Sequence, residues 1–250
     1  MANPSSAASS RAPLPSAASI RVPLSEEERH NGYSPDLPTK LSDITWRVFR
    51  IMAEFVEGFE FLSHAGKSVS IFGSTRFQPD HPWYEEARRL AHKLGKGGFT
   101  VITGGGPGIM EAANRGAYEA GAPSLGLNIE LPHEQRINPY VRHSRGFHYF
   151  FTRKVMLAAA SMAYVYFPGG LGTLDEMAEL TNLIQTEKMQ RIPIILVGKD
   201  FWSPLLAWIE KTMGRQYKTI SPEDTSIYRL VDSADEAFEL IRSAPDRAFF

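Results

Sequence analysis

The 250-residue sequence contains no cysteine. This absence excludes disulfide bonds, thiol nucleophiles and metal sites built from thiolates, and it makes a reducing compartment the default location. We therefore expect a cytoplasmic protein.

Strong net charge and long apolar runs are also absent. The chain has 27 Lys and Arg against 28 Asp and Glu, and no apolar run approaches the length of a transmembrane helix. A near-neutral chain gives no reason to expect nucleic acid or a membrane surface as its partner, which leaves small anions as better candidates. With 43% hydrophobic residues, the length suffices for a sizeable core in one domain.

Motifs of several enzyme classes are missing as well. No His, Asp and Glu residues fall at a convincing metal-ligand spacing, and neither the G-x-S-x-G elbow nor the G-x-x-x-x-G-K-[ST] loop occurs. A dinucleotide fingerprint starting at Gly104 would need glycine at position 109, where Ile109 stands. We expect neither a metal nor a cofactor.

The first 40 residues differ in composition from the rest. The first 24 hold sixteen Ser, Ala or Pro and no acid, which predicts a disordered tail over 1–40. The composition also faintly resembles that of an organellar transit peptide, although no amphipathic helix is evident. Next, a helix is predicted over 41–66, capped by Ser42 or Asp43, with an apolar stripe that suits packing on the domain or on another subunit. The stripe consists of Ile44, Val48, Ile51, Phe55, Phe59 and Leu62.

Residues 67–245 alternate short β-rich runs with longer helical patterns. Continuous apolar strands separated by helices predict a parallel sheet covered on both faces, which is an α/β Rossmann-like doubly wound fold. The expected strands are 68–73, 99–103, 124–129, 163–167, 193–197 and 227–231, and the expected helices are 83–95, 108–120, 152–162, one that ends at Met189, 201–213 and 234–241.

Two loops that follow strands are rich in small residues. Ligands of such sheets bind beyond the carboxyl ends of the strands, where the strand order reverses. Gly73 and Ser74 begin the first loop, which is a weak signal because Gly-Ser turns are common there. The second loop contains Gly104, Gly105 and Gly106 before a predicted helix, where free amides and the helix dipole favour an anion; a tight turn is the alternative.

The third loop follows the strand at 163–167 and reads PGGLGTLDE. The amides of its glycines and the Thr173 hydroxyl suit a phosphate monoester. Thr173 and Glu176 also form the pattern of a capping box, in which Glu176 reaches back to the Thr173 amide. A carboxylate at a helix start tends to stay ionised, so Glu176 could stabilise a developing cation. The two roles do not exclude each other.

Arg153 and Lys154 open the predicted helix at 152–162. Two cations at a helix N-terminus oppose the macrodipole, which calls for an explanation. One interpretation is chance placement on the surface. The other is that Arg153 grips a phosphate or orients a leaving group with its rigid fork of donors.

These motifs together resemble those of the LOG family, the cytokinin riboside 5′-monophosphate phosphoribohydrolases. The resemblance rests on PGGLGTLDE at 168–176, TRK at 152–154 and GGGPGIMEA from Gly104. It implies a Rossmann-like fold, a homodimer or higher oligomer such as a hexamer, and cleavage of the N-glycosidic bond of nucleoside 5′-monophosphates, AMP included, without a cofactor.

The resemblance also implies roles for individual residues. Arg153 and Glu176 would be the catalytic pair, and Glu134 would be the acid on the base side. The residues expected to bind substrate are Gly73, Ser74, Gly104, Gly105, Gly106, Asn128, Glu134, Lys154, Gly169, Gly170, Leu171, Gly172, Thr173 and Asn182. Two positions depart from the family pattern: Asp175 replaces a glutamate, and Asn182 stands where a threonine is frequent.

Three other functions are weighed against this one. A protein that carries a nucleotide or cofactor on the same loops without cleaving it is the main alternative. A single-stranded DNA binder lacks the expected basic, aromatic-lined groove. Family members were long labelled lysine decarboxylases, but no lysine and ring-nitrogen partner for a pyridoxal cofactor can be assembled from the sequence.

Overall fold

The computed structural model describes residues 41–130 and 137–247. The chain from Val48 onward forms one compact unit, and the described residues before it, 41–47, belong to a separate unit. The expectations for residues 1–40 and for Glu134 lie outside the described residues.

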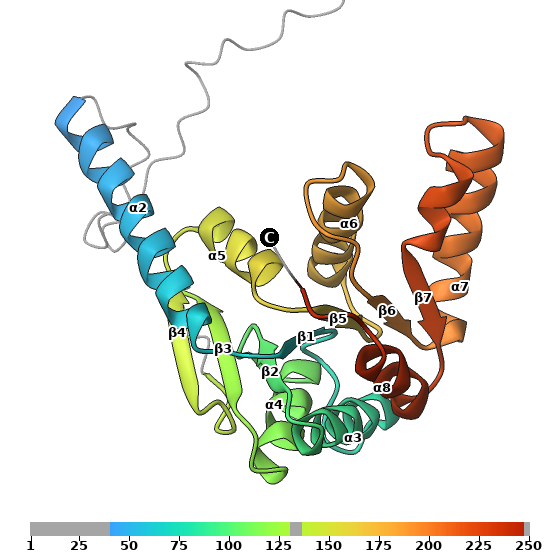
Figure 1. The fold of residues 1–250 in the computed structure, drawn as a ribbon, viewed down its shortest axis with the longest axis horizontal. Helices are drawn as coiled ribbons and strands as arrows, with labels where there is room; N and C mark the ends of the chain where they lie inside the picture. Colours follow the sequence, from blue (N-terminus) through green and yellow to red (C-terminus); the bar gives the residue numbers. More distant parts are fainter. Residues whose placement is uncertain (1–40, 131–136, 248–250) are drawn as a thin grey trace, which may run out of the picture. The chain divides into compact units, whose positions relative to one another are not determined.

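A parallel sheet is the centre of the compact unit (Figure 1). In the described part of the chain it has seven strands in the order β4-β3-β2-β1-β5-β6-β7. This confirms the predicted α/β Rossmann-like doubly wound fold. The strands are β1 (Ser68–Phe72), β2 (Thr100–Thr103), β3 (Ser124–Ile129), β4 (His143–Phe147), β5 (Ala163–Tyr166), β6 (Ile194–Val197) and β7 (Tyr228–Val231).

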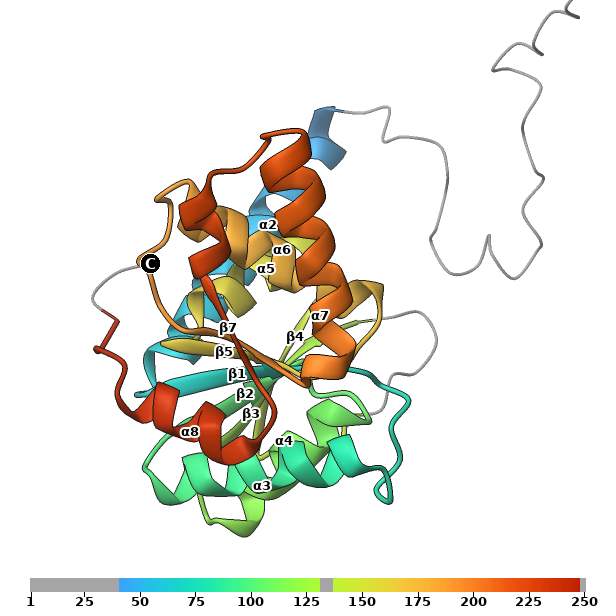
Figure 2. The same cartoon turned by 90° about the vertical axis from the view of Figure 1, so that its right-hand side faces the viewer.

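Helices cover both faces of the sheet (Figure 2). One face carries α3 (Pro82–Lys96), α4 (Ile109–Glu119) and α8 (Ala234–Arg242). The other face carries α5 (Phe150–Ala159), α6 (Leu171–Gln185), α7 (Lys199–Trp208) and the part of α2 (Leu41–Ser63) that begins at Val48. A π-helical segment, η2 (Ile209–Gln216), continues α7, and a 3-10 turn, η3 (Pro222–Ser226), precedes β7. No helix in the described ranges is long and apolar enough to cross a membrane.

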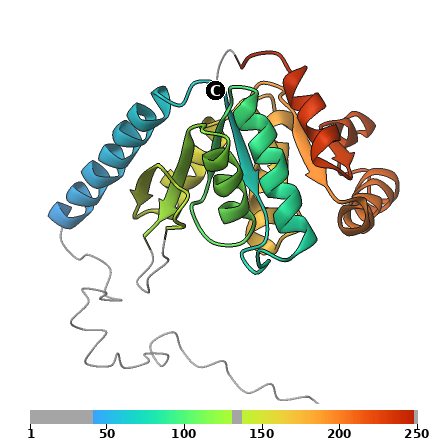
Figure 3. The ribbon, with the colours of Figure 1, turned by 90° about the horizontal axis from the view of Figure 1, so that it is seen from below.

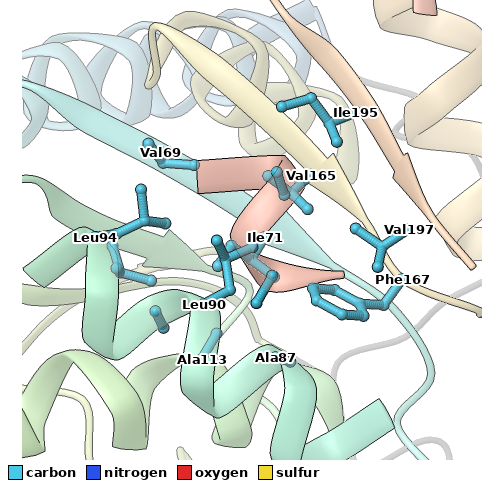
Figure 4. Close-up of a cluster of buried hydrophobic side chains, with 14 of the residues drawn as sticks. Val69, Ile71, Ala87, Leu90, Leu94, Ala113, Val165, Phe167, Ile195 and Val197 are labelled. Atoms are coloured by element: carbon cyan, nitrogen blue, oxygen red, sulfur yellow. The ribbon is translucent and has the colours of Figure 1, made fainter. Parts of the chain in front are cut away.

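Side chains along each strand point alternately to the two faces of the sheet, so a hydrophobic core forms on each face. Val69 and Ile71 of β1 point to the face of α3 and α4, whereas Phe72 points to the opposite face. Figure 4 shows the first cluster, with Leu90 of α3 beside Ile71 and Val165. Both faces are buried, so most residues of the inner strands are apolar, with buried polar exceptions such as Ser70 and Thr103. Each buried large apolar side chain contributes about 1.5–3 kcal/mol. The helices α3 and α4 lie side by side over this cluster (Figure 3).

Several elements differ from the predicted ones. β4 lies at 143–147, where a long loop was expected, and pairs with β3 at the sheet edge. In its sequence, HSRGF, His143 and Ser144 are exposed and only Phe147 is buried, so the strand has no apolar run. α2 begins at Leu41, which places Ser42 and Asp43 inside the helix, so the prediction that one of them is the cap is wrong. Only the first part of the helix predicted at 201–213 is α-helical.

The strand order reverses between β1 and β5, which makes this the switch point of the sheet. From β1 the chain moves outward through β2, β3 and β4, and it then returns to pair β5 with β1 on the other side. The loops after these strands are joined by backbone hydrogen bonds: the Ser74 amide donates to the Pro168 carbonyl (3.0 Å), and the Ile109 amide donates to the Ser74 carbonyl (2.9 Å). The three glycine-containing loops therefore form one connected surface at the switch point.

Candidate functional site

A cleft of about 680 Å³ lies at the switch point. Its walls are the loops after β1, β2 and β5 and the first turns of α5 and α6. The cleft therefore lies where doubly wound sheets generally bind their ligands. Of the residues expected to act on substrate, the structure brings together Gly73, Ser74, Gly104, Arg153, Gly169, Gly170, Gly172, Thr173 and Glu176.

The other expected residues do not line the cleft. Gly105 and Gly106 are buried behind Gly104, and Asn182 and Leu171 are exposed elsewhere on α6. Lys154 points to α6. Asn128 is buried, and its Oδ1 accepts no hydrogen bond from the described residues. Glu134 lies in the segment 131–136, outside the described residues.

A buried polar network holds the loop after β2. The Asn138 amide group donates to the carbonyls of Gly105 (3.1 Å) and Gly106 (3.0 Å) and to Asn114 Oδ1 (2.9 Å). The Thr103 hydroxyl donates to the same Asn114 oxygen (2.6 Å) and accepts from the Gly105 amide (2.9 Å). Gly105 and Gly106 therefore set the course of the loop that carries Gly104, and Gly105 does so with a positive φ of 73°.

The start of α6 corrects the predicted capping box. The helix begins at Leu171, with Gly170 as its N-cap and without a side-chain capping bond. Thr173 is therefore the third helical residue, and its side chain lies against Gly169 rather than at the helix end. The glycines allow the chain to turn into the helix directly after the strand, before Thr173 is reached. The Thr173 hydroxyl and the Glu176 carboxylate are thus released from capping, and both residues are buried.

Arg153 enters the cleft from the first turns of α5. Its Nε donates to the Leu127 carbonyl at the end of β3 (2.7 Å). Its Nη2 occupies the space beside Gly104 where any larger side chain would overlap it. Burial lowers the pKa of Arg153, and the Glu176 carboxylate opposes that shift. A guanidinium keeps its charge under such conditions, so Arg153 presents fixed donors at the cleft wall.

Lys154 connects α5 to α6 from outside the cleft. Its ammonium lies 2.8 Å from Asp175 Oδ2 and 3.2 Å from Glu179 Oε2. The lysine therefore contributes to the position of Glu176, which lies on the same helix as both acids.

Glu176 is a buried carboxylate with no hydrogen-bond donor among the described residues. Burial raises its pKa to about 7, while Arg153 and Lys154 lower it and Glu179 and Asp175 raise it. The expectation that the helix start holds Glu176 fully ionised is therefore wrong. Removal from water outweighs the helix dipole, because Glu176 lies on the sixth position of α6 and the dipole acts mainly within the first turn. Near neutral pH the carboxyl exchanges readily between its two forms.

Aromatic side chains form the remaining wall, which sequence motifs did not reveal. Phe77 stacks on His81 with ring centres 3.9 Å apart, and Phe150 lies 5.9 Å from the Arg153 guanidinium. Trp83 and Phe201 complete this wall. Aromatic residues next to a glycine loop carry no spacing signal, so only the fold brings them together. Within the described ranges no group of His, Asp and Glu could hold a metal ion, and no described lysine lines the cleft.

The raised pKa of Glu176 predicts a pH-dependent effect on stability. The neutral form is stabilised in the folded state, so this contribution is fully present below about pH 4.5 and is lost as the pH rises through about 7. A shift of the Glu176 pKa from 4.5 to about 7 corresponds to about 3 kcal/mol in the free energy of unfolding. Glu176→Gln should therefore unfold at higher urea concentration than the wild type at pH 8, with most of that gain absent at pH 5.

The control for this measurement is Glu60→Gln, which changes an exposed carboxylate on α2. It should leave the urea midpoint nearly unchanged at both pH values. An equal gain for Glu176→Gln at pH 5 and pH 8 would contradict the assignment of the shift to Glu176.

Comparison with curated proteins finds relatives with related names. A probable cytokinin riboside 5′-monophosphate phosphoribohydrolase of Oryza sativa subsp. japonica is 29% identical over 159 residues, which are 62% of each chain. An enzyme of the same name from Arabidopsis thaliana is 28% identical over 70% of this chain and 80% of its own. The pyrimidine/purine nucleotide 5′-monophosphate nucleosidase of Escherichia coli K12 is 27% identical over 65% of this chain and 38% of its own. The chain thus spans less than two thirds of the first relative and of the nucleosidase.

Solved structures share the fold. The molybdenum cofactor binding protein of Rippkaea orientalis has a TM-score of 0.54 at 22% identity, covering 70% of this chain and 94% of its own. The molybdenum cofactor carrier protein of Chlamydomonas reinhardtii has a TM-score of 0.55 at 18% identity, covering 70% and 96%. A family model described as "Possible lysine decarboxylase" matches residues 110–241. Because that match covers more than half of the 250 residues, the chain belongs to this family, the LOG family.

Proposed function

We propose that this protein hydrolyses the N-glycosidic bond of nucleoside 5′-monophosphates and releases the free base and ribose 5-phosphate. The observation that carries the proposal is the meeting of Glu176, Arg153 and the glycine loop after β5 in one cleft. The names of the relatives support the same substrate class, since they refer to cytokinin riboside 5′-monophosphates and to nucleotide 5′-monophosphates.

The 5′-phosphate would bind at the start of α6. The first amides of a helix have no acceptor within the helix, and the positive end of its dipole favours an anion. Gly170 and Gly172 leave the backbone uncovered, since no atom lies within 4 Å of the place where a Cβ would stand. The Thr173 hydroxyl lies beside this backbone. A phosphate bound there would hold the ribose at a constant distance from Glu176, which lies in the second turn of α6.

Glu176 would act at C1′ of the ribose. Cleavage of a glycosidic bond passes through a state with oxocarbenium character, so a carboxylate near C1′ stabilises the transition state more than the ground state. The same carboxylate can accept a proton from the attacking water, and its pKa of about 7 suits a general base at neutral pH. Binding energy from the phosphate, which does not react, would hold C1′ in place.

Arg153 and the aromatic wall would serve the other parts of the nucleotide. Arg153 would hold the phosphoribosyl group or stabilise the departing base, because its donors are already fixed by the Leu127 carbonyl. The wall of Phe77, Trp83, Phe150 and Phe201 offers flat apolar surfaces on which a base can stack. The site thus has a charged end and an aromatic end, as a nucleotide has.

Two other functions have less support in this cleft. A pyridoxal-dependent decarboxylase needs a lysine for a Schiff base, and no described lysine lines the cleft, so the residues do not fit that cofactor. A carrier that binds a nucleotide or cofactor without cleaving it would not need a buried carboxylate whose ionised form is costly. The structural neighbours named as molybdenum cofactor proteins show the fold alone.

We also propose a homo-oligomer in a reducing compartment such as the cytoplasm. Met52, Val56 and Phe59 of α2 expose large apolar side chains on the compact unit, with Val56 66% exposed. Exposed apolar patches of this kind mark protein interfaces, and a second copy of the chain is the partner that the resemblance implies. The absence of cysteine remains the support for the compartment.

Purified protein should release adenine from AMP and isopentenyladenine from its riboside monophosphate, with ribose 5-phosphate as the second product. Glu176→Gln should lower kcat by about 10²–10⁴-fold because it removes the base and the negative charge. Liquid chromatography of the reaction measures both products. Glu60→Gln provides the control at an exposed site, and recovery of intact nucleotide from the wild type after long incubation would favour the carrier instead.

The activity should depend on the ionised form of Glu176. We expect kcat/KM to rise about tenfold per pH unit below pH 7 and to level off above it, since the pKa is raised to about 7. Lys154→Met removes a cation that lowers this pKa, so the rise of kcat/KM with pH should move to higher pH. If the rise stays at the same pH in this variant, it reflects ionisation of the substrate phosphate instead.

The oligomer should depend on the apolar face of α2. Light scattering of the purified chain should give a mass of at least two copies of 27.9 kDa. Val56→Glu should lower that mass because it places a charge in the interface. Tyr217→Glu is the matched control, since Tyr217 is equally exposed at 66% but lies next to η2. A monomeric wild type would contradict the proposal.

A further inference from the structure

The helix that carries Arg153 begins without a cap of its own. The N-cap residue of α5 is Tyr149, whose side chain makes no capping hydrogen bond, and its first turn contains no acid. Arg153 follows as the fourth residue of the helix and opposes its dipole, whereas Lys154 lies beyond the first turn. The first amides of such a helix need acceptors from elsewhere in the molecule.

Glu54 of α2 supplies acceptors just before the helix, for the amides of His148 and of the N-cap residue Tyr149. Its Oε1 accepts from the His148 amide (2.8 Å), and its Oε2 accepts from the Tyr149 amide (3.3 Å) and lies within hydrogen-bond reach of the Thr152 hydroxyl. Glu54 is only 8% exposed. A buried carboxylate with three donors is well satisfied, and its charge stabilises the N-terminus of α5.

We propose that Glu54 is a positioning residue for Arg153, a role that rests on the proposed function of the cleft. Thr152 and Tyr149, which contact Glu54, lie within one turn of Arg153. Arg153 in turn contacts the Leu127 carbonyl and the backbone at Gly104. A small rotation of α5 would break the first of these contacts and withdraw the guanidinium from the cleft.

The packing of α2 on α5 makes this connection rigid. Gly58 lies one turn after Glu54, and a Cβ on Gly58 would stand 2.6 Å from Met156 Sδ. The two helices therefore touch closely beside the Met156 side chain, while the Glu54 carboxylate fixes the end of α5. With both contacts in place, α2 sets the position of α5 along its axis as well as its rotation.

The test compares four variants of the full-length protein. Glu54→Gln keeps the shape and one acceptor oxygen but brings an amide group to face the donors, and Glu54→Ala removes all acceptors. Thr152→Val removes the hydroxyl partner alone. Glu57→Ala is the matched control, because Glu57 is an acid on the same helix that pairs with Arg145 at a half-exposed site.

Two measurements are made on each variant. Base release from AMP gives kcat and KM separately. The NMR signal of the Arg153 Nε–H, assigned with Arg153→Lys, reports the hydrogen bond to Leu127 through its rate of exchange with water and does not depend on activity.

We expect Glu54→Gln and Glu54→Ala to lower kcat on the order of 100-fold with a smaller change in KM, since displacement of a reacting group by about 1 Å has this effect. Exchange of the Arg153 Nε–H should become faster in both variants. Thr152→Val should show a smaller loss in both measurements, and Glu57→Ala should resemble the wild type.

The outcomes separate the two proposals. If the wild type releases no base from any monophosphate, the proposed function fails, and slow Arg153 exchange that becomes fast in Glu54→Gln still supports the positioning of Arg153. If Glu54→Gln has wild-type kcat and wild-type exchange, the role of Glu54 is overturned. A loss of kcat that Glu57→Ala shares to the same extent would also overturn it.

Discussion

The burial of Glu176 beside Arg153 is the interaction on which the site depends. The carboxylate receives no hydrogen bond from the described residues, and burial raises its pKa to about 7. A buried group of this kind destabilises the fold when it is ionised, so its persistence needs a surrounding structure that prevents its relaxation. Arg153 offers a partial countercharge at the cleft wall without forming a closed ion pair with it. The carboxylate thus remains available to a ligand.

The rigidity that holds this arrangement comes from the backbone rather than from large side chains. The loops after β1, β2 and β5 are joined through the Ser74 backbone, which accepts from Ile109 and donates to Pro168. Gly108 has a φ of 69°, and a side chain there would overlap the loop at Ser74 and Thr75. Glycine is required at that position by both conformation and space. Close approach of the loops brings their backbone and the Arg153 side chain into the wall of one cleft.

The fold could be predicted from the sequence because its strands are buried on both faces. Their apolar runs alternate with helical periodicity, and that alternation identifies a parallel sheet. β4 was missed because it is not buried on both faces and therefore has no continuous apolar run. As an edge strand it keeps polar residues such as His143 and Ser144 exposed, so only its hydrogen bonds to β3 identify it.

The site could be predicted in its composition but not in its electrostatics. The glycine loops, Arg153 and Glu176 carry motifs, whereas the ionisation of Glu176 depends on burial, which no spacing encodes. The predicted capping box was wrong because the Thr-x-x-Glu pattern occurs inside a helix as well as at its start. Only the structure shows that α6 begins at Leu171, two residues before Thr173. Glu54 acts on a partner 98 residues away, so a local pattern contains no trace of it.

Lys154 and Glu54 hold α5 in place from two sides. Lys154 contacts Asp175 and Glu179 of α6, and Glu54 binds the end of α5 from α2. The helix α5 is thus held by acids on two different elements, α2 and α6. The positive charge of Lys154 forms the link to α6. Because those contacts are directional, α5 has one position in which Lys154 and Thr152 are both satisfied. In that position Arg153 reaches the Leu127 carbonyl. The helix α2, which precedes the first strand of the sheet, therefore holds the end of α5 through Glu54, although no described residue of α2 from Val48 onward lines the cleft.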